Sequence, residues 1–511
     1  MKQTVFSTKF SFDGLERLRL FARGLFSTGR GRVVVAHALS ERAFPYQHGD
    51  SIRPLRGRYN GVDVERQEAI HQAAIQRPEG ASLDDVRAWL NSTKNRGMAL
   101  GLIHTKAALD RLSLPHQPQH IIHVAGSNGK GTVCALMAGS LSLSGVSNLF
   151  FSSPHLVRVE ERIRFNGIPI DAPLFNRALN KVRSASKLEP EIPLTFFEVT
   201  YLAAMQCASD AGVEVLILET GLGGRKDATR SGPATVCLVT SLSAEHKDVL
   251  GSSLSLIARE KAAIARPGGR LLIRDPSDAA VKDAMLEEAS MAGQPSLGES
   301  RVPAKTQWVE IPRGSSVRQE AMILAEALFT AVDLPKEHLQ LANKTVRWPA
   351  RMQHLSVQAT GHHPYLLDAA HNPSGLRRVL PELEQIIQAA CEGEEGGWSL
   401  LFGTSPQDDL DVFCAPLLDL CQRYPPHMVV LSEPQGGRYP GVDSDALAQY
   451  PWQCSVQHTI KLPNDAVQTL LQHPPSSVGL VVSLGSLYLQ GNLLEALGLD
   501  GDGHLSLLAK G

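Results

Sequence analysis

Short runs of apolar residues alternate along the chain with longer segments in which apolar positions recur with helical spacing. Residues 121–125, 213–218 and 236–240 are nearly continuous apolar runs, the pattern of a strand buried on both faces of a parallel sheet. Residues 196–211 and 254–265 have the length and spacing of helices. Because strands alternate with helices, we expect an α/β fold with a parallel sheet that helices cover on both faces.

A second α/β pattern lies nearer the C-terminus. The polar, Pro/Gly-rich residues 292–316 that precede it are expected to form a loop, and residues 319–332 a helix. The segment Trp348-Pro349-Ala350-Arg351 has the composition of a hinge between domains. The expected strands of the second pattern are residues 365–368, 398–402, 428–432 and 478–484.

The length of 511 residues exceeds what one hydrophobic core usually supports, so we expect more than one domain. The boundaries expected from the pattern are an N-terminal extension at 1–80, a central domain at 81–345 and a smaller, Rossmann-like C-terminal domain at 346–511. The extension is expected to be disordered or to act in targeting.

Composition narrows the class of protein. A hydrophobic content of 43% and a charged content of 20% are ordinary for a globular protein. The net charge of −2 argues against a nucleic-acid partner, and no apolar run reaches the roughly 18 residues of a membrane span. The seven scattered cysteines contain no CxxC pair, which favours reduced thiols over a disulfide framework or a zinc site.

These features predict a cytoplasmic protein, with one alternative. The first 32 residues carry seven Lys or Arg against only Asp13 and Glu16, and they include Ser and Phe residues. Such a basic, acid-poor segment is typical of an organelle presequence, so a mitochondrial location stays open.

The most informative segment is His123-Val124-Ala125-Gly126-Ser127-Asn128-Gly129-Lys130-Gly131-Thr132. An expected strand enters this glycine-rich turn and an expected helix leaves it, which is the layout of a phosphate-binding loop. Backbone N–H groups at the start of the helix would face phosphate oxygens, and Lys130 would add a positive charge. An extra glycine between Lys130 and Thr132 departs from the usual G-x-x-x-x-G-K-[ST] pattern, so an ordinary strand-to-helix turn stays open. The candidate ATP-binding residues here are Gly126, Ser127, Asn128, Gly129, Lys130, Gly131 and Thr132.

Polar side chains also follow the other expected strands of the first pattern. Ser153 and His155 follow a further expected strand at residues 146–151. Glu219 follows the strand at 213–218, and Glu245 and His246 follow the strand at 236–240. Since ligands bind beyond the carboxyl ends of parallel strands, we expect these groups near the phosphates. A hydroxyl, a carboxylate and an imidazole there would suit Mg²⁺, which keeps water and phosphate oxygens among its ligands.

The order of several blocks resembles that of the folylpolyglutamate synthase/dihydrofolate synthase family, within the Mur ligase superfamily. The resemblance covers about residues 82–500. The matching blocks are G-S-N-G-K-G-T (126–132), S-P-H-L (153–156), E-R-I-R-F-N-G-I-P-I (161–170), L-T-F-F-E-V-T (194–200), E-T-G-L-G-G-R-K-D-A-T (219–229), E-H-x-x-x-L-G (245–251), I-A-R-E-K-A (257–262), L-D-A-A-H-N-P (367–373) and G-S-L-Y (485–488).

The resemblance implies a role for each matching residue. Lys130 would hold the β- and γ-phosphates of ATP, and Lys130, Lys261 and His246 would be catalytic. Lys261 matches a lysine that is carbamylated in the family, where its new carboxylate helps hold a second Mg²⁺; the alternative is a helix lysine that faces solvent. The implied Mg²⁺ ligands are Ser153, Glu219, His246 and carbamylated Lys261. The implied pterin-contacting residues are Thr195, Phe197 and Asp227. The further implied ATP contacts are Arg351 and Asp368, together with His371, which lies beside them.

The implied activity is an ATP-dependent amide ligation. The carboxylate of dihydropteroate or a folate would become an acyl phosphate, and the amine of L-glutamate would displace the phosphate. Domains that close about the hinge would keep water from the acyl phosphate. The expected partners are these small molecules, ATP and Mg²⁺, with no nucleic acid and no membrane, and the resemblance implies a monomer.

Some positions depart from the family pattern, and they leave alternatives open. A non-catalytic member of the fold, or a ligase for another acid, would also fit the sequence. The carboxylate of Glu320 cannot donate the hydrogen bonds of the amide found at that place in the family. The other departures are Glu245 and Lys247 around His246, Lys226 and Arg230 in the G-G-R-x-D-A-T block, and Ala263 and Ala350 in place of glycines.

Overall fold

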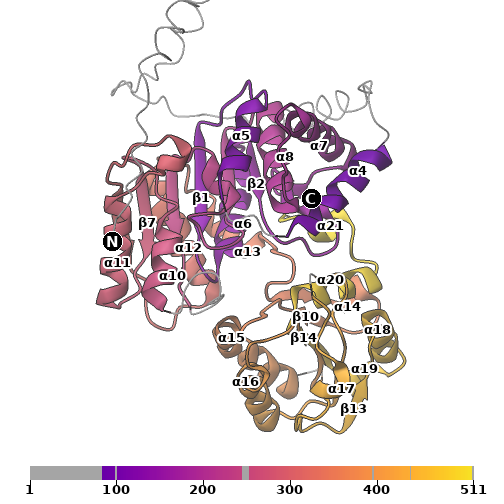
Figure 1. Cartoon of the computed structure of the whole chain (residues 1–511). Helices are drawn as coiled ribbons and strands as arrows, with labels where there is room; N and C mark the ends of the chain where they lie inside the picture. Colours follow the sequence, from indigo (N-terminus) through magenta and orange to yellow (C-terminus); the bar gives the residue numbers. More distant parts are fainter. Residues whose placement is uncertain (1–82, 98–100, 244–252, 394–395, 438, 509–511) are drawn as a thin grey trace, which may run out of the picture. The chain divides into compact units, whose positions relative to one another are not determined.

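The computed structural model of the protein describes residues 83–97, 101–243, 253–393, 396–437 and 439–508. These residues form two mixed, mostly parallel sheets covered by helices (Figure 1), which confirms the expected α/β class. The first sheet has eight strands in the order β4-β3-β2-β5-β1-β6-β7-β8. They are β1 (His120–Ala125), β2 (Asn148–Phe151), β3 (Ile163–Phe165), β4 (Ile168–Pro169), β5 (Val215–Glu219), β6 (Val236–Val239), β7 (Arg270–Arg274) and β8 (Lys305–Val309).

Strand residues of the first sheet alternate between two helical layers, since successive side chains of a strand point to opposite faces. Ile121 and Leu216 pack with one set of helices, whereas Ile122 and Ile217 pack with the other. On the first face lie α4 (Leu83–Ser92), α5 (Ile103–Arg111), α7 (Ala172–Lys187) and α8 (Phe196–Ala211), with α10 (Leu254–Ala262) and α11 (Ala279–Ser290) beside β6 and β7. On the second face lie α6 (Lys130–Leu143), α12 (Val317–Ala331) and α13 (Leu339–Thr345).

Both edges of this sheet differ from the expected pattern. At one edge, β3 pairs antiparallel with β2 and with β4, so the sheet is not wholly parallel. Asn166 and Gly167 turn between β3 and β4 with φ of 46° and 82°, as a two-residue hairpin turn requires. At the other edge, β8 lies within residues 292–316, so the expectation of a loop there is wrong. Its side chains alternate in exposure, and backbone pairing with β7 holds the strand.

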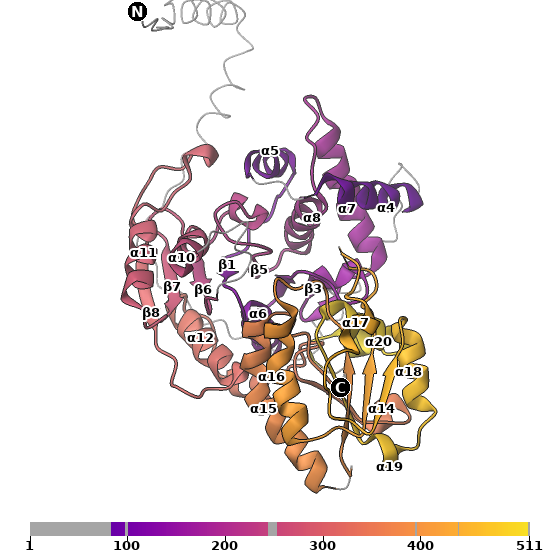
Figure 2. The same cartoon turned by 60° about the horizontal axis from the view of Figure 1, so that its bottom comes forward.

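The second sheet has six strands in the order β13-β12-β11-β14-β10-β9 and is parallel except for β9. Its strands are β9 (Gln353–Leu355), β10 (Tyr365–Leu367), β11 (Trp398–Phe402), β12 (Met428–Leu431), β13 (Val456–Thr459) and β14 (Leu480–Leu484). In Figure 2, α15 (Pro373–Glu392) and α16 (Leu410–Arg423) lie on one side of these strands and α18 (Pro463–Leu471) and α20 (Leu487–Ala496) on the other. The remaining helices are η1 (Thr93–Arg96), η2 (Val159–Arg162), η3 (Ala228–Ser231), η4 (Pro295–Leu297), α14 (Val357–Thr360), α17 (Ser444–Leu447), α19 (Pro475–Val478) and α21 (Asp502–Leu505).

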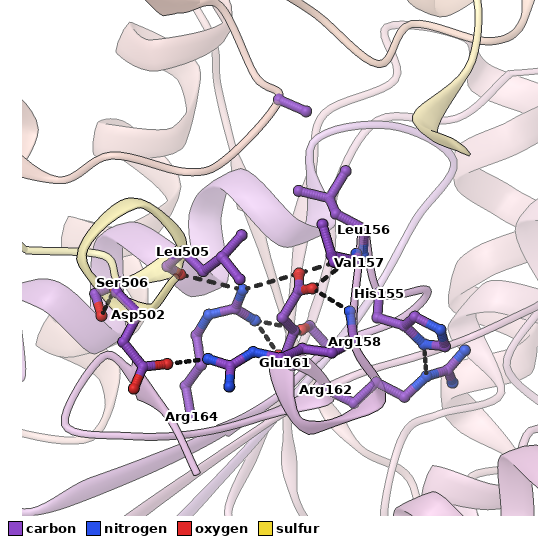
Figure 3. Close-up of polar contacts among 12 residues, drawn as sticks. His155, Leu156, Val157, Arg158, Glu161, Arg162, Arg164, Asp502, Leu505 and Ser506 are labelled. Atoms are coloured by element: carbon purple, nitrogen blue, oxygen red, sulfur yellow. Dashed lines mark hydrogen bonds and ion pairs between the residues drawn. The ribbon is translucent and has the colours of Figure 1, made fainter. Parts of the chain in front are cut away.

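The chain after α20 returns to the first sheet. Leu507 is fully buried in the core formed by α6, α12 and α13. Its backbone N–H donates to the carbonyl of Gly167 in the β3–β4 turn, and its carbonyl accepts from Arg347. Asp502 pairs with Arg158 (Figure 3). Within the described residues, no helix is long and apolar enough to cross a membrane.

Candidate functional site

The candidate phosphate loop joins β1 to α6, as the sequence predicts. Gly126 has φ of 146°, and a Cβ on it would lie 1.8 Å from Thr240 Oγ1 at the end of β6. Gly129 caps α6 in the left-handed conformation, with φ of 84°. A side chain would be strained at both positions. The loop therefore brings its backbone close to the end of β6 before α6 begins at Lys130.

The extra glycine of the loop, Gly131, makes room for Trp348. A Cβ on Gly131 would lie 2.9 Å from Trp348 Nε1 and 3.1 Å from its Cζ2. The indole also packs on Phe150, at 5.5 Å between ring centroids, and the Arg164 guanidinium carbon lies 4.8 Å from the centroid of the indole ring. The departure from the usual loop pattern thus has a packing reason, since it lets the predicted hinge segment contact the loop.

Lys130 and Asn128 connect the loop to its surroundings. Lys130 Nζ donates to the carbonyls of Gly126 and Ser127 at 2.8 Å and 3.2 Å. Asn128 Nδ2 donates to the hydroxyl of Ser374, at the start of α15, at 2.8 Å. The loop therefore contacts an element of the second sheet directly. Thr132 lies partly exposed in the first turn of α6.

Two of the predicted metal ligands lie together beside this loop. The Ser153 backbone N–H donates to Glu219 Oε2 at 3.4 Å. Burial raises the pKa of the Glu219 carboxyl, while the charges of Lys130 and Arg351 act in the opposite direction. A buried carboxylate at the end of β5, beside the phosphate loop, can supply an oxygen ligand to a divalent cation. The third predicted ligand, His246, and its neighbours Glu245 and Lys247 lie outside the described residues.

The described residues contain no group of three or more His, Cys, Asp or Glu side chains arranged to hold a metal ion. This does not conflict with Mg²⁺, because Mg²⁺ typically takes only one or two carboxylates from a protein and completes its octahedron with water and phosphate oxygens.

Lys261 lies against the phosphate loop. It is on α10, its side chain is 2% exposed, and Nζ donates to the Gly126 carbonyl at 3.0 Å. The alternative in which this lysine faces solvent is therefore wrong. Its amine and the amine of Lys130 both reach the Gly126 carbonyl, so the two predicted catalytic lysines converge on one atom.

Two of the three predicted pterin-contacting side chains converge on the backbone of Gly221. A Cβ on Gly221 would lie 2.7 Å from the Phe197 ring and 3.3 Å from Asp227 Oδ2. Phe197 is partly exposed and packs on Phe151, at 5.8 Å between ring centroids. Asp227 is buried, which raises the pKa of its carboxyl, while hydrogen bonds from Thr229 oppose this shift. A flat apolar face and a buried hydrogen-bond acceptor thus stand next to each other.

Thr195, the third of these residues, has a structural partner. It caps α8: its hydroxyl donates to Glu198 Oε2 at 2.8 Å, and its backbone N–H donates to the same oxygen at 2.8 Å. This is a capping box, which satisfies N–H groups at the start of a helix.

The residues predicted to contact ATP from the second sheet follow β10 and the hinge. Asp368 accepts hydrogen bonds from the N–H groups of Met352 and Ala370, both at 2.8 Å. Burial raises the pKa of this carboxyl, and the Arg351 guanidinium opposes the shift. The charge of Arg351 acts to lower the pKa of both Glu219, in the first sheet, and Asp368, which follows β10 of the second sheet. His371 is exposed, and its Nδ1 lies 2.9 Å from the Ala369 carbonyl.

A small cavity of about 30 Å³ lies among these groups. Its lining includes the extra glycine of the phosphate loop, two candidate metal ligands and two arginines. These residues are Gly131, Ser153, Glu219, Arg164 and Arg351, with Trp348, Pro349, Pro154, Leu156, Glu161 and Leu487 completing the wall.

Glu161 and Arg164 also line this cavity, although the motif pattern assigns neither of them a role (Figure 3). The Glu161 carboxylate accepts from the backbone N–H groups of Leu156, Val157 and Arg158 and lies 3.7 Å from Arg164. It thereby orders the loop that carries Ser153. Both residues belong to the E-R-I-R-F block, but only the fold shows that their side chains turn toward the cavity.

His155 does not lie with Ser153 and Glu219, the two predicted metal ligands beside the phosphate loop. Arg162 Nε donates to its Nδ1 at 2.9 Å, and its ring lies 6.5 Å from that of Phe196. Burial and the charge of Arg162 lower the pKa of His155 to about 3, so the imidazole is neutral at physiological pH.

Comparisons with known proteins agree with this arrangement, although no family model matches the chain. The chain is 29% identical over 333 residues to the dihydrofolate synthase/folylpolyglutamate synthase of Bacillus subtilis, which covers 59% of this chain and 76% of that protein. It is 30% identical over 361 residues to a putative folylpolyglutamate synthase of Caenorhabditis elegans, which covers 66% of each chain.

Solved structures give the same result. The bifunctional folylpolyglutamate synthase/dihydrofolate synthase from Yersinia pestis, complexed with AMPPNP and Mn ion, matches with a TM-score of 0.65 and 25% identity, over 83% of this chain and 100% of that one. Escherichia coli FolC in complex with DHPP and ADP shares the fold with a TM-score of 0.65 and 24% identity, over 83% and 99% of the two chains. Together with the two-sheet architecture, these matches show that the chain belongs to the folylpolyglutamate synthase/dihydrofolate synthase family, with the Mur ligase fold.

Proposed function

We propose that the protein is an ATP-dependent ligase that joins L-glutamate to dihydropteroate, to folates or to both, through an acyl phosphate. The observation that carries the proposal is the cavity in which the phosphate loop, Glu219 and Arg351 meet. The relatives support it, because the Yersinia pestis protein binds AMPPNP and Mn ion and the Escherichia coli protein binds DHPP and ADP.

The proposed nucleotide site is the start of α6. Its backbone N–H groups and the positive end of the helix dipole favour phosphate oxygens. Lys130 exchanges its hydrogen bonds to the loop carbonyls for the β- and γ-phosphates when ATP binds. Arg351 and Asp368 contact the nucleotide from the hinge and the second sheet, and His371 lies two residues beyond Ala369 on the same turn.

Ser153, Glu219 and His246 are the proposed Mg²⁺ ligands. Magnesium bound there would offset the charge of the phosphoryl group during transfer. Glu219 would supply the negative charge for this role, since a bound cation favours the ionised carboxyl against the effect of burial. Glu161 holds the loop that carries Ser153 in place. We further propose that Lys261 is carbamylated. Its burial against the loop supports this, because a carboxylate there would add a hard oxygen ligand beside the phosphates.

The proposed acceptor site is formed by Phe197, Asp227 and Thr195. The Phe197 ring offers an apolar face for a flat heterocycle, and Asp227 accepts hydrogen bonds from its N–H groups. The acceptor carboxylate would then attack the γ-phosphorus of ATP, which releases ADP and forms the acyl phosphate. The amine of L-glutamate attacks the acyl carbon, phosphate leaves, and an amide forms.

Exclusion of water is the second requirement of this reaction, because water would hydrolyse the acyl phosphate. Residues 81–345 and 346–511 are proposed as the two domains that close over it, with the hinge at Trp348–Arg351. The contact from Asn128 to Ser374 supports a closed arrangement, since it joins the phosphate loop to α15.

The test is ADP release by the purified protein with Mg-ATP and L-glutamate. Release that depends on dihydropteroate identifies a dihydrofolate synthase, and further release with tetrahydrofolate identifies a bifunctional enzyme. The control omits L-glutamate. If a sample that binds ATP releases no ADP in response to either acceptor, the proposal is wrong and a non-catalytic member or a ligase for another acid takes its place.

A further inference from the structure

A buried hydrogen-bond chain runs from Arg266 to the Asp227 carboxylate. Its central member is His123, which lies on β1 with its side chain fully buried, three residues before Gly126, where the phosphate loop begins. His123 Nε2 lies 2.7 Å from Thr229 Oγ1, and the Thr229 hydroxyl donates to Asp227 Oδ1. An imidazole is costly to bury in a strand unless its nitrogen atoms have hydrogen-bond partners. Both ring nitrogens of His123 have such partners.

The direction of each hydrogen bond in the chain follows from chemistry. Arg266 Nη2 lies 3.4 Å from His123 Nδ1, and a guanidinium can only donate, so Nδ1 accepts and the ring proton is on Nε2. Burial and the charges of Arg266 and Arg230 lower the pKa of His123 well below its usual value, which keeps the ring neutral. Nε2–H then donates to the Thr229 hydroxyl, and that hydroxyl donates to Asp227. Every proton in the chain therefore points toward the carboxylate.

The chain also fixes the loop that carries Asp227. His123 Nε2 contacts the hydroxyls of Thr220, at 2.9 Å, and of Thr229, which stand at the two ends of residues 221–228. Asp227 Oδ1 accepts from the N–H and hydroxyl of Thr229, and Oδ2 accepts from the Leu222 N–H at 2.9 Å. The carboxylate plane is thus held from both ends of the loop, beside the Phe197 ring.

We propose that His123 and Thr229 are positioning residues for the acceptor substrate: the chain from Arg266 through His123 and Thr229 sets the orientation of the Asp227 carboxylate. The inference rests on the proposed function, in which Asp227 accepts hydrogen bonds from a heterocycle with N–H donors. If the inference is right, substitution of His123 or Thr229 weakens acceptor binding although neither residue touches the acceptor. Nucleotide binding should stay unchanged.

The sequence of the loop offers a matched pair of variants. Thr229→Val and Thr220→Val each replace a buried threonine that contacts His123 by a residue of the same shape. Only Thr229 also donates to Asp227. The acceptor KM of Thr229→Val is expected to rise about tenfold or more, with the ATP KM and kcat within about twofold, because a buried hydrogen bond to a charged group is lost. Thr220→Val is expected to leave the acceptor KM within about twofold.

A second pair tests the chain at its centre. His123→Gln keeps a donor near the position of Nε2 and is expected to retain the acceptor KM within about threefold, whereas His123→Leu removes the donor and is expected to raise it about tenfold. The acceptor dissociation constant, measured by calorimetry without ATP, is expected to follow the same order. Thermal unfolding of all four variants reports any loss of stability separately.

The outcomes separate this inference from the function on which it rests. If the wild-type protein shows no acceptor-dependent ADP release, the proposed function fails. If it does, and Thr229→Val and Thr220→Val lower the melting temperature alike without moving the acceptor KM, the chain is only structural and the inference is overturned. If Thr229→Val does not fold, the His123→Gln and His123→Leu comparison decides, and equal acceptor KM values in that pair contradict the inference.

Discussion

Ala350 stands in the proposed hinge segment with φ of 56°, in the left-handed region. A Cβ in this region crowds the following carbonyl and costs a residue other than glycine roughly 1–2 kcal/mol. Hydrogen bonds hold the strained residue: its N–H donates to Gln353 Oε1 at 2.8 Å, and its carbonyl accepts from Ala369 at 2.9 Å. Ala263 also replaces a glycine of the family pattern, but its φ is −65°, which suits alanine. The two alanines therefore form a matched pair for measuring the hinge strain.

Substitution by glycine removes one buried methyl at each site, since Ala350 is 0% exposed and Ala263 is 5% exposed. The lost methyl costs about 0.8 kcal/mol, and the greater freedom of glycine in the unfolded chain costs about 0.4–1 kcal/mol. At Ala263 nothing offsets these terms, so Ala263→Gly is expected to lower the free energy of unfolding by about 1.5 kcal/mol. At Ala350 the relief of strain offsets them, so Ala350→Gly is expected to lie within about 0.5 kcal/mol of the wild type.

Urea unfolding of the two variants and the wild type, followed by intrinsic fluorescence, measures the difference directly. The expected gap of about 1–2 kcal/mol between the variants comes only from backbone conformation, because the side-chain change is identical. Equal losses in Ala350→Gly and Ala263→Gly would refute the reasoning, since they would mean that the hinge stores no strain.

The remaining predictions concern the candidate site. Lys130→Ala is expected to reduce ADP release at least about 100-fold, and near-normal turnover would count against the phosphate-loop assignment. Glu219→Gln is expected to raise the Mg²⁺ concentration needed for half-maximal activity or to abolish activity; unchanged values of both would reject the metal assignment. Lys261→Ala is expected to be rescued in part by small carboxylic acids, and its activity should be assayed with and without them. Gly131→Ala is expected to lower the free energy of unfolding, measured with urea, by about 1–2 kcal/mol, because the new methyl group would clash with Trp348. The clash is expected to outweigh the higher helix propensity of alanine.

Central elements of the fold could be predicted because local sequence and burial agree there. The helix expected at 196–211 has those same ends in the structure, since Thr195 and Glu198 form a capping box at its start and Gly212, with φ of 59°, ends it. The strand expected at 121–125 is one residue longer and fully buried apart from His120. In such segments the apolar periodicity and the capping residues predict the same type of element with the same ends.

The edges of the sheets could not be predicted in the same way. Strand β8 has the burial pattern of an edge strand, with only its last residue buried, so it lacks a continuous apolar run. It exists because its backbone pairs with β7, a contact between segments some 35 residues apart that no local pattern reveals. The β3–β4 hairpin did have a signal, the Asn166-Gly167 pair between apolar residues, which is typical of a two-residue turn.

Strand ends predicted candidate site residues better than they predicted how those residues are arranged. Ser153 and Glu219 lie together because both stand at the carboxyl ends of neighbouring parallel strands, as topology requires. His155, only two residues beyond Ser153, turns away toward Arg162 and Phe196. The direction of a loop side chain depends on partners from elsewhere in the chain, here the Glu161 carboxylate that binds three successive N–H groups.

The departures from the family pattern show the same dependence on distant partners. Glu320 departs from the family pattern because a carboxylate cannot donate hydrogen bonds as an amide does. In the structure it is buried and accepts from Arg274, at the end of β7, and from Arg378, on α15. Its charge therefore joins the two sheets instead of standing unpaired, and a buried carboxylate between two arginines is costly to disrupt.

Arg230, the charged replacement in the G-G-R-x-D-A-T block, follows the same rule. It is fully buried, pairs with Glu299 and donates to the carbonyls of Ala263 and Ala265. In each case the sequence displays one charged residue out of place, while the compensating group lies about 45 to 70 positions away. Both departures therefore have partners in the fold, so neither leaves an uncompensated buried charge that would destabilise the chain.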